Sequence, residues 1–443
     1  MGTAPITKNR ESNIARGKTP IEKNIIVIDE NNIKHNSTYL RRAKGLVKNG
    51  RARWVDDKTI CLTELCSASC PPLDINITED LFVNKNIDNI KEKMTAFLLE
   101  NANPSIKRRI KNEILHNLTA EEAKNYQEQI LQEPLIQKIA AIQKENGWIE
   151  NGIIRHFDMP EGAIKYLAEK AVDKNTPVLR RAMDAYSEYC FNKHTVPGYD
   201  EFKYPCTGYN LHRCACIARA GYNDNDEVDI SPQIQLSFDS FRRVLEIDSV
   251  FDILHLEKIR GKIERHVFND YEKWPCRHHL DILAHTNSWK NEENIRTVAE
   301  SVKEMMRTDN PKLVSYVPNG QSGTGCWGGL FPAQGLTVMG AGIYPSPIVT
   351  PDIQNGYYHF QLIEWVAKCG IVKYVPALRE IVNEIADSID DGGVCRLPMV
   401  AEDVFKSWNQ FAGLQLEVDW RSKTRRDCDV TFRALLIIHY ASI

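Results

Sequence analysis

The chain has 443 residues, of which 42% are hydrophobic and 26% charged, and its formal net charge is -3. This composition is that of an ordinary globular protein and excludes the disordered, collagen-like and coiled-coil classes. No stretch approaches the roughly 18 uncharged apolar residues that a membrane span requires, and the polar, basic N-terminus lacks the apolar region of a secretory signal. We therefore expect a cytoplasmic protein whose twelve cysteines are reduced thiols.

The N-terminal part of the chain is basic. Residues 1–60 carry 13 Lys and Arg against 6 Asp and Glu, so of the chain's 56 and 59 the remainder carries 43 against 53. Residues 1–20 lack periodicity and predict a disordered tail. Residues 21–72 predict a small α+β module with a strand at Ile25–Asp29, a helix at Leu40–Lys48 and a strand–turn–strand at Arg53–Leu62.

The rest of the chain predicts a mainly α fold. Residues 73–145 have apolar positions at helical spacing and form a helical connector in this interpretation. From residue 146 to 443 a short apolar helix recurs, and each of four copies is followed by a polar turn and a second amphipathic helix. The four copies are Ile164–Ala171, Cys214–Gly221, Leu280–Asn287 and Leu362–Gly370, with Ala168, Ala218, Ala284 and Ala367 at equivalent places. A single hairpin cannot bury its apolar face, so the hairpins must stack.

One long segment interrupts the repeats. Residues Ser315–Thr350 are dense in Gly and Pro yet rich in apolar and aromatic side chains, including Trp327. A loop of this length within a compact domain is typically functional. We expect it to line or cover a cavity.

The hairpin pattern resembles the terpenoid cyclase and prenyltransferase family. The resemblance spans about residues 145–443 and rests on Gly147-Trp148 before one repeat, Asp391-Gly392-Gly393 after another and Asp419-Trp420-Arg421 before the last. It implies an α/α toroid that binds an apolar or prenyl-type small molecule in its central cavity. The sequence lacks the D-x-D-D run of class II cyclases, since the nearest text is Asp387-Ser-Ile-Asp390-Asp391, and also lacks the aspartate-rich motif of class I cyclases.

The N-terminal module is similar to the RRXRR domain of ancestral RNA-guided nucleases. The matching residues are Ile26–Glu30, Tyr39–Arg53 and Ile60–Leu62. This resemblance implies contact with a nucleic-acid backbone through Arg41, Arg42, Lys44, Lys48, Arg51 and Arg53. Six cations within thirteen residues can neutralise phosphates, and the neighbouring Trp54 can stack on a base. The alternative is a solvated helix face.

Two acidic or mixed clusters are candidate sites in the helical part. Asp390 and Asp391 are the carboxylates that could donate a proton, or else the residues of an Asp-Asp-Gly-Gly turn. The second cluster predicts either a ligand site or an internal ion-pair network, with Asp429 and Arg433 able to pair at i, i+4. Its members are Asp419, Trp420, Arg421, Arg425, Asp429 and Arg433.

No metal site or cofactor is predicted. His278 and His285 lie two turns apart, and Cys206, His212, Cys214 and Cys216 lack a recognised metal-ligand spacing. The leading hypothesis is a toroid protein that binds a small molecule, with catalysis left open. The alternatives are a nucleic-acid-associated accessory protein and a non-catalytic helical scaffold that binds other proteins.

Overall fold

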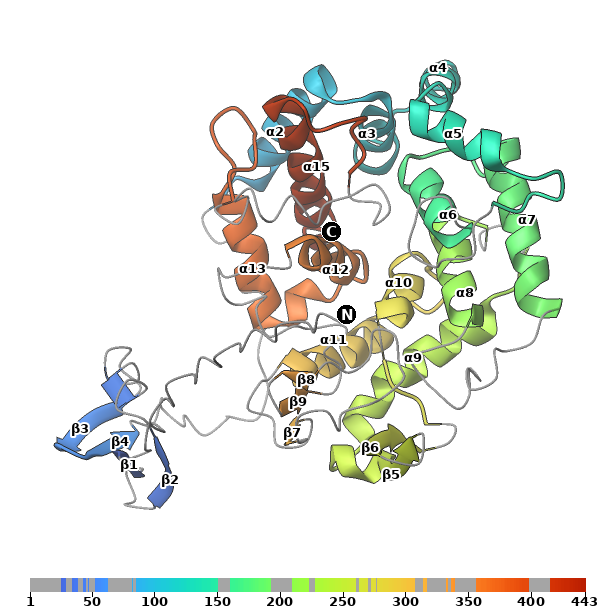
Figure 1. Cartoon of the computed structure of the whole chain (residues 1–443). Coiled ribbons are helices and arrows are strands. Elements are labelled where there is room, and N and C mark those ends of the chain that lie inside the picture. The colour runs from blue at the N-terminus through green and yellow to red at the C-terminus, as the bar shows by residue number, and fades with distance from the viewer. Residues whose placement is uncertain are drawn as a thin grey trace, which may run out of the picture. The chain divides into compact units, whose positions relative to one another are not determined.

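The computed structural model describes residues 25–28, 34–38, 43–44, 47, 52–62, 82, 85–149, 160–192, 209–222, 228–259, 263–269, 272–275, 277–306, 314–316, 332–333, 336–338, 356–397 and 415–443. The chain divides into two compact units, which we call the N-terminal unit (Met1–Glu79) and the helical unit (Asp80–Ile443). Each is described by itself below. Figure 1 labels their helices and strands.

The N-terminal unit contains a four-stranded mixed sheet in the order β2-β1-β4-β3. Its strands are β1 (Ile25–Ile28), β2 (Lys34–Thr38), β3 (Ala52–Asp56) and β4 (Thr59–Leu62). Strand β1 pairs parallel with β4, whereas β1–β2 and β3–β4 are antiparallel. The small core gathers Ile25, Val27, Ala43, Ala52 and Ile60.

The predicted strands at Ile25–Asp29 and within Arg53–Leu62 are confirmed. Of the predicted helix Leu40–Lys48, the structure describes Ala43, Lys44 and Val47, all of them helical. Strand β2 was not expected, because its sequence KHNST has no apolar alternation. Strand β2 is held in the sheet by its antiparallel backbone pairing with β1, which the pattern of its side chains does not predict.

The helical unit is mainly α-helical, and it contains both helices of each of the four predicted repeats. Its α-helices are α2 (Ile87–Asn101), α3 (Pro104–Arg109), α4 (Ala120–Leu131), α5 (Pro134–Ile142), α6 (Pro160–Glu169), α7 (Pro177–Asn192), α8 (Tyr209–Arg219), α9 (Ser231–Glu246), α10 (Arg277–Ala284), α11 (Glu292–Met306), α12 (Gly356–Lys368), α13 (Pro376–Asp387) and α15 (Lys423–Ala441). The four recurring helices fall within or across α6, α8, α10 and α12, and their predicted partners within or across α7, α9, α11 and α13. The segment interpreted as a connector contributes α2 to α5 to this unit.

Local sequence sets where several helices begin. Proline occupies the first turn of α3, α5, α9 and α13, where its missing N–H costs nothing. The Asn103 side chain accepts a hydrogen bond from Ile106 N at 3.0 Å and caps α3. Thr119 and Glu122 form a capping box at the start of α4.

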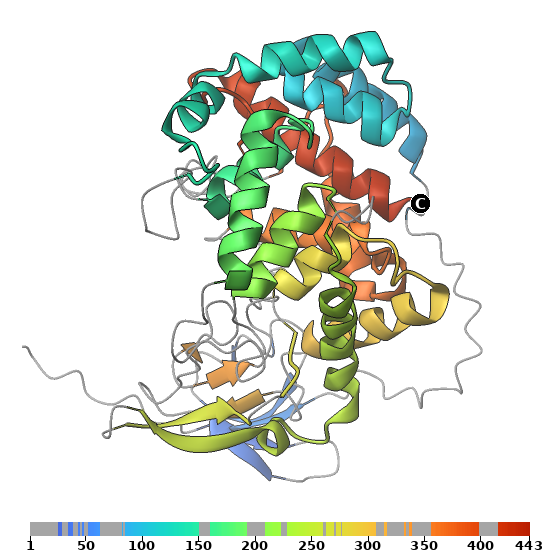
Figure 2. The same cartoon turned by 90° about the vertical axis from the view of Figure 1, so that its right-hand side faces the viewer.

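Successive helices pack side by side into one apolar core. Helix α6 packs on α8, α8 on α10, α10 on α12, and α12 on α15, and α15 also lies along α2. Figure 2 shows α15, in red, running beneath the blue and cyan helices α2 to α5. The core contains residues from nearly every helix of this unit, so the hairpins bury their apolar faces on one another.

Two seven-residue turns share one geometry. Residues 143–149 and 389–395 each close with an antiparallel bridge, Gln143 to Ile149 and Ile389 to Cys395. The fifth residue of each is a glycine with positive φ, +85° at Gly147 and +78° at Gly393. A Cβ at Gly147 would lie 2.1 Å from the Arg181 carbonyl oxygen on α7, so only glycine fits there.

Short strands and irregular helices complete the described residues. Strands β5 (Leu254–Ile259) and β6 (Ile263–Phe268) form an antiparallel hairpin after η2 (Val250–Ile253), and η4 (Val372–Tyr374) precedes α13. Strands β7 (Val314–Tyr316), β8 (Pro332–Ala333) and β9 (Leu336–Val338) pair within the segment predicted as a loop. Among the helices the structure describes, none is long and apolar enough to cross a bilayer.

Candidate functional site

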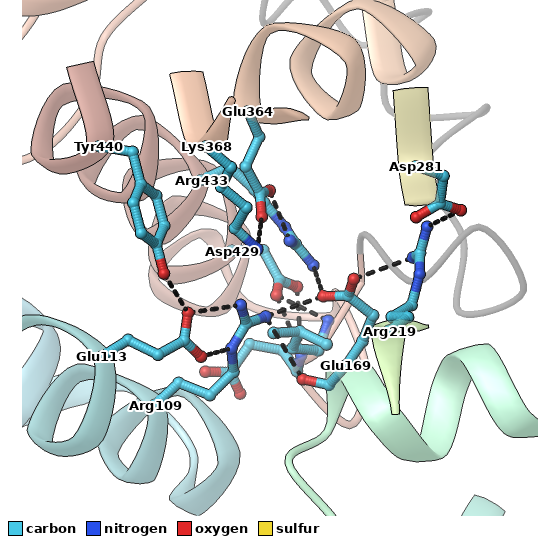
Figure 3. A network of polar contacts seen from close by, with 12 residues as sticks. Arg109, Glu113, Glu169, Arg219, Asp281, Glu364, Lys368, Asp429, Arg433 and Tyr440 are labelled. Carbon is cyan, nitrogen blue, oxygen red and sulfur yellow. Dashed lines mark hydrogen bonds and ion pairs between the residues drawn. The ribbon is translucent and has the colours of Figure 1, made fainter. Parts of the chain in front are cut away.

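A buried network of ion pairs lies at the centre of the helical unit, and Figure 3 shows it from close by. It joins four carboxylates to three guanidinium groups and one ammonium group, so its formal charges balance. We call it the central network, and its members are Arg109, Glu113, Glu169, Arg219, Asp281, Glu364, Lys368 and Arg433.

Glu169 is the hub of the central network. Its carboxylate oxygens lie 2.8 Å from Arg109 Nη1, 2.9 Å from Arg219 Nη1 and 3.0 Å from Arg433 Nη2. Glu169 ends α6, while the three arginines belong to α3, α8 and α15. One carboxylate therefore ties together four helices that are distant in sequence (Figure 3).

Two arms extend from this hub. On one side Arg433 Nη1 lies 2.7 Å from Glu364 Oε2, and Lys368 Nζ lies 3.0 Å from Glu364 Oε1. On the other side Arg219 Nη2 lies 2.7 Å from Asp281 Oδ2. The second carboxylate oxygen of Asp281 lies 3.0 Å from His285 Nδ1, so this arm ends on an imidazole.

A third arm runs from Arg109 through η1 to α15. Arg109 holds Glu113 through two contacts, Nε to Oε1 at 2.5 Å and Nη2 to Oε2 at 3.0 Å. The Tyr440 hydroxyl donates to the same Glu113 carboxylate at 3.1 Å. Glu113 lies on a single π-helical turn, η1 (Ile110–Ile114), a distortion that is frequent at functional sites.

Burial makes these pairs strong and mutually dependent. The side chains of Glu169, Glu364 and Arg433 are at most 3% exposed. Burial alone would raise the pKa of Glu169, but Arg433, Arg109 and Arg219 hold it well below the ordinary range. Burial likewise opposes ionisation of Glu364, yet Lys368 and Arg433 lower its pKa to about 2. The carboxylates therefore stay ionised at neutral pH.

The pKa values of the His285 imidazole and the Arg219 guanidinium group are shifted in opposite directions. Burial, together with nearby Lys368, lowers the pKa of His285, so this imidazole is neutral at pH 7. Burial also opposes the charge of Arg219, but Asp281 and Glu169 raise its pKa above the ordinary value. The Arg219 guanidinium additionally lies 5.2 Å from the centre of the Trp365 ring, a cation–π contact.

Each of six helices contributes to the central network: α3, α6, α8, α10, α12 and α15. We call them the network helices. Apart from Arg433 and Glu364, each network residue lies in the last turn of its helix or in the π turn that follows α3. These polar residues at the helix ends are visible in the sequence, although the repeat pattern did not single them out. The residues directly after the four equivalent alanines are Glu169, Arg219, His285 and Lys368, all polar at the end of apolar helices.

The predicted polar cluster of α15 is divided between two environments. Arg433 belongs to the central network, where it pairs with Glu169 and Glu364, whereas the helical spacing had offered Asp429 as its partner. Asp429 accepts hydrogen bonds from Leu416 N at 2.7 Å and from Trp420 Nε1 at 2.6 Å. Asp419 instead pairs with Arg425 at 2.6 Å near the surface, where Arg421 is also exposed.

Asp390 and Asp391 lie in the second of the two seven-residue turns. Asp390 accepts from Val394 N at 2.8 Å and from Arg396 Nε at 2.9 Å. Burial opposes its ionisation, but these two hydrogen bonds hold the pKa of Asp390 below its usual range. Asp391 is fully exposed. These contacts match the turn interpretation, and an ionised Asp390 has no proton to donate at neutral pH.

The nucleic-acid-binding residues are only partly within the described structure. Lys44 is exposed in the helical segment, and Arg53 and Trp54 are exposed on the edge strand β3. Four other candidates, Arg41, Arg42, Lys48 and Arg51, lie outside the described residues, as does Trp327 of the predicted covering loop.

A small pocket of about 190 Å³ opens beside the π turn. It is lined by polar and apolar residues of the third arm and of the turn after α6, namely Arg108, Arg109, Asn112, Glu113, Leu118, Ala171, Val172 and Asp173. Within the part of the chain that the structure describes, no group of three or more His, Cys, Asp or Glu side chains is placed to hold a metal ion. Comparison with protein families, curated proteins and solved structures finds no match for this chain.

Proposed function

We propose that the helical unit is an α/α toroid of the terpenoid cyclase and prenyltransferase type, and that it binds an apolar or prenyl-type small molecule. The order of packing supports this. The network helices follow one another from α6 to α15, and Arg109 at the end of α3 returns to Glu169 at the end of α6. Six network helices joined in this way would form a closed ring.

The two related turns also support a ring. The turn at Gly147 follows α5 and lies against Arg181 of α7, the second helix of the next pair, and the turn at Gly393 follows α13 and lies against Lys93 of α2. If each turn contacts the helical pair that follows it in space, the pair α2–α3 would follow α12–α13. The chain's first helical hairpin would thus close the array that its last hairpin leaves open.

The observation that carries the proposal is an asymmetry between the two ends of the network helices. After each of α3, α6, α8, α10 and α12, seven to eleven residues lead to the next helix. Before each of α6, α8, α10, α12 and α15, the connection is 16 to 49 residues long. Long connections on a rigid helical scaffold are where ligand sites are usually built. The central network would be the polar floor beneath such a site.

The polar residues next to the central network restrict the chemical class of ligand that could bind there. One helical turn before the network residues, at i−3, lie the buried side chains of Tyr166, Cys216, His278 and Gln361. In this proposal they would form a layer of polar groups between the ion pairs and the long connections. A prenyl-type molecule would place its polar end on this layer and its apolar body toward the long connections.

Binding is tested with the full chain and defined probes. Farnesyl diphosphate and farnesol should each raise the thermal unfolding midpoint of the protein, because a ligand that binds only the native state stabilises it. Inorganic diphosphate is the control for the charged group alone. Native mass spectrometry before and after denaturation records any molecule that co-purifies. No shift with either prenyl probe and no bound mass would contradict the proposal.

A second function is favoured by one observation on the N-terminal unit. The Trp54 side chain is 36% exposed on the edge strand β3, next to the exposed Arg53. Consecutive strand residues point to opposite faces of the sheet, so the indole would stack on a base at one face while Arg53 contacts the nucleic-acid backbone from the other face of the edge strand. We propose RNA or DNA binding here. Affinity for a labelled oligonucleotide should fall with salt and with Arg53→Ala plus Trp54→Ala. Equal affinity of variant and wild type would remove this function.

A further inference from the structure

Residues 415–422, which directly precede α15, are attached to three helices through a second buried polar cluster. Glu417 Oε1 accepts from Asn103 N at 2.9 Å, and Lys170 Nζ donates to the Leu416 carbonyl at 2.5 Å. Lys170 also pairs with Glu133. Together with Asp429 these groups form what we call the Glu417 cluster, namely Glu133, Lys170, Glu417 and Asp429.

The charges within the Glu417 cluster do not balance. All four side chains are buried, with Asp429 and Lys170 0% exposed and Glu417 3% exposed. Three carboxylates therefore face one ammonium group away from water. Adjacent buried carboxylates cannot all be ionised without a large cost, so such groups retain a proton instead. This contrasts with the central network, where carboxylates and cations are equal in number.

Hydrogen bonding indicates which carboxyl group keeps the proton. Asp429 accepts from three N–H donors, those of Leu416, Glu417 and the Trp420 indole. Glu133 has the Lys170 ammonium group as its direct partner. Glu417 has one backbone N–H, that of Asn103. Donors stabilise the ionised form of a carboxyl group, so the least supported group is the one to be protonated.

We propose that Glu417 is protonated in mildly acidic solution and loses its proton near neutral pH, and that this ionisation weakens the attachment of residues 415–422 to α3, α6 and α15. The neutral acid is compatible with an ionised Asp429 beside it. A second negative charge in the same buried space repels the first and disfavours the contacts that hold Leu416 and Glu417 in place.

Burial raises the pKa of all three carboxyl groups of the Glu417 cluster, including that of Glu133. Burial and then the charge of Asp429 raise the pKa of Glu417 to about 7. Burial raises the pKa of Asp429 to about 6, against the opposing effect of its hydrogen bonds. The charged and titratable groups that face the two carboxyl groups from the packed elements are Glu133, Tyr166, Lys170, Arg425 and Cys428.

Infrared difference spectroscopy tests the proton directly. A spectrum of the full chain at pH 6 minus that at pH 8.5 should show the carbonyl stretch of a protonated carboxylic acid, and Glu417→Gln should remove the part of this band that is lost above pH 7. The matched control is Glu128→Gln, which changes an exposed glutamate on α4 and should keep the band. Absence of the band in the wild type at pH 6 would overturn the proposal whatever the variants do.

The same variants locate the proton and its effect. A band that persists in Glu417→Gln but is lost in Asp429→Asn would place the proton on Asp429 and overturn the assignment. The unfolding midpoint of the wild type should fall relative to that of Glu417→Gln as pH rises from about 5 to 8, because a raised carboxyl pKa contributes stability only on the acid side. Parallel pH profiles of the two proteins would show that Glu417 does not titrate there. This inference does not depend on the proposed function.

Discussion

Arg219 joins Glu169 to Asp281, with its two terminal nitrogens 2.9 and 2.7 Å from the two carboxylates. The three residues come from α8, α6 and α10, so a single guanidinium group bridges three successive network helices. A buried ion pair is not in itself evidence of high stability, because desolvation opposes it. Its removal, however, leaves a partner charge buried and uncompensated.

We therefore expect Arg219→Met to destabilise the helical unit by about 3–5 kcal/mol. The buried carboxylates of Glu169 and Asp281 would each lose one direct partner. Chemical denaturation followed by circular dichroism measures the effect. Arg421→Met is the control, because Arg421 is exposed and should change the free energy of unfolding by less than about 0.5 kcal/mol. Equal effects of the two substitutions would show that the central network does not hold the helices together.

Acid should unfold the helical unit through the central network. The pKa of Glu364 is lowered from 4.5 to about 2. Its contribution to the free energy of unfolding is therefore present above pH 4.5 and is lost as the pH falls from about 4.5 to 2. The unfolding midpoint of the wild type should fall across this range. Glu364→Gln should lower the midpoint at pH 7 and flatten its acid dependence, whereas Glu128→Gln should leave both unchanged. An acid dependence equally steep in Glu364→Gln would contradict this assignment.

Neighbouring glycines in one turn should respond differently to the same substitution. Gly393 has φ +78°, and a Cβ there would lie 2.4 Å from the backbone of Lys93. Gly393→Ala should therefore destabilise the protein by more than about 1 kcal/mol. At Gly392 the nearest atom would be Asp390 Oδ1 at 3.3 Å, so Gly392→Ala should cost much less. Thermal unfolding of the two variants makes the comparison, and similar losses would show that the turn does not approach α2 this closely.

Ligand binding above the central network should depend on the layer one turn before it. His278→Ala and Gln361→Ala each shorten a buried side chain of that layer, so each should reduce the thermal shift produced by farnesyl diphosphate. The control is Glu128→Gln, which should leave the shift unchanged. Each variant is compared with its own ligand-free midpoint, which separates loss of binding from loss of stability. An unchanged shift in both variants would place the ligand elsewhere.

Periodicity in the sequence determined the mainly helical fold, the hairpins of α6 to α13 and the strands β1, β3 and β4, because helical and strand spacing are local properties. Local turn chemistry likewise determined the role of Asp390 and Gly393. The central network required the tertiary structure. Glu169 and Arg433 are 264 positions apart, and only the packing of the network helices brings them within 3.0 Å. The equivalent alanines indicated which helices recur. The sequence does not indicate, however, which residue pairs with a charged side chain in an apolar helix, because the tertiary structure determines which charges lie close together.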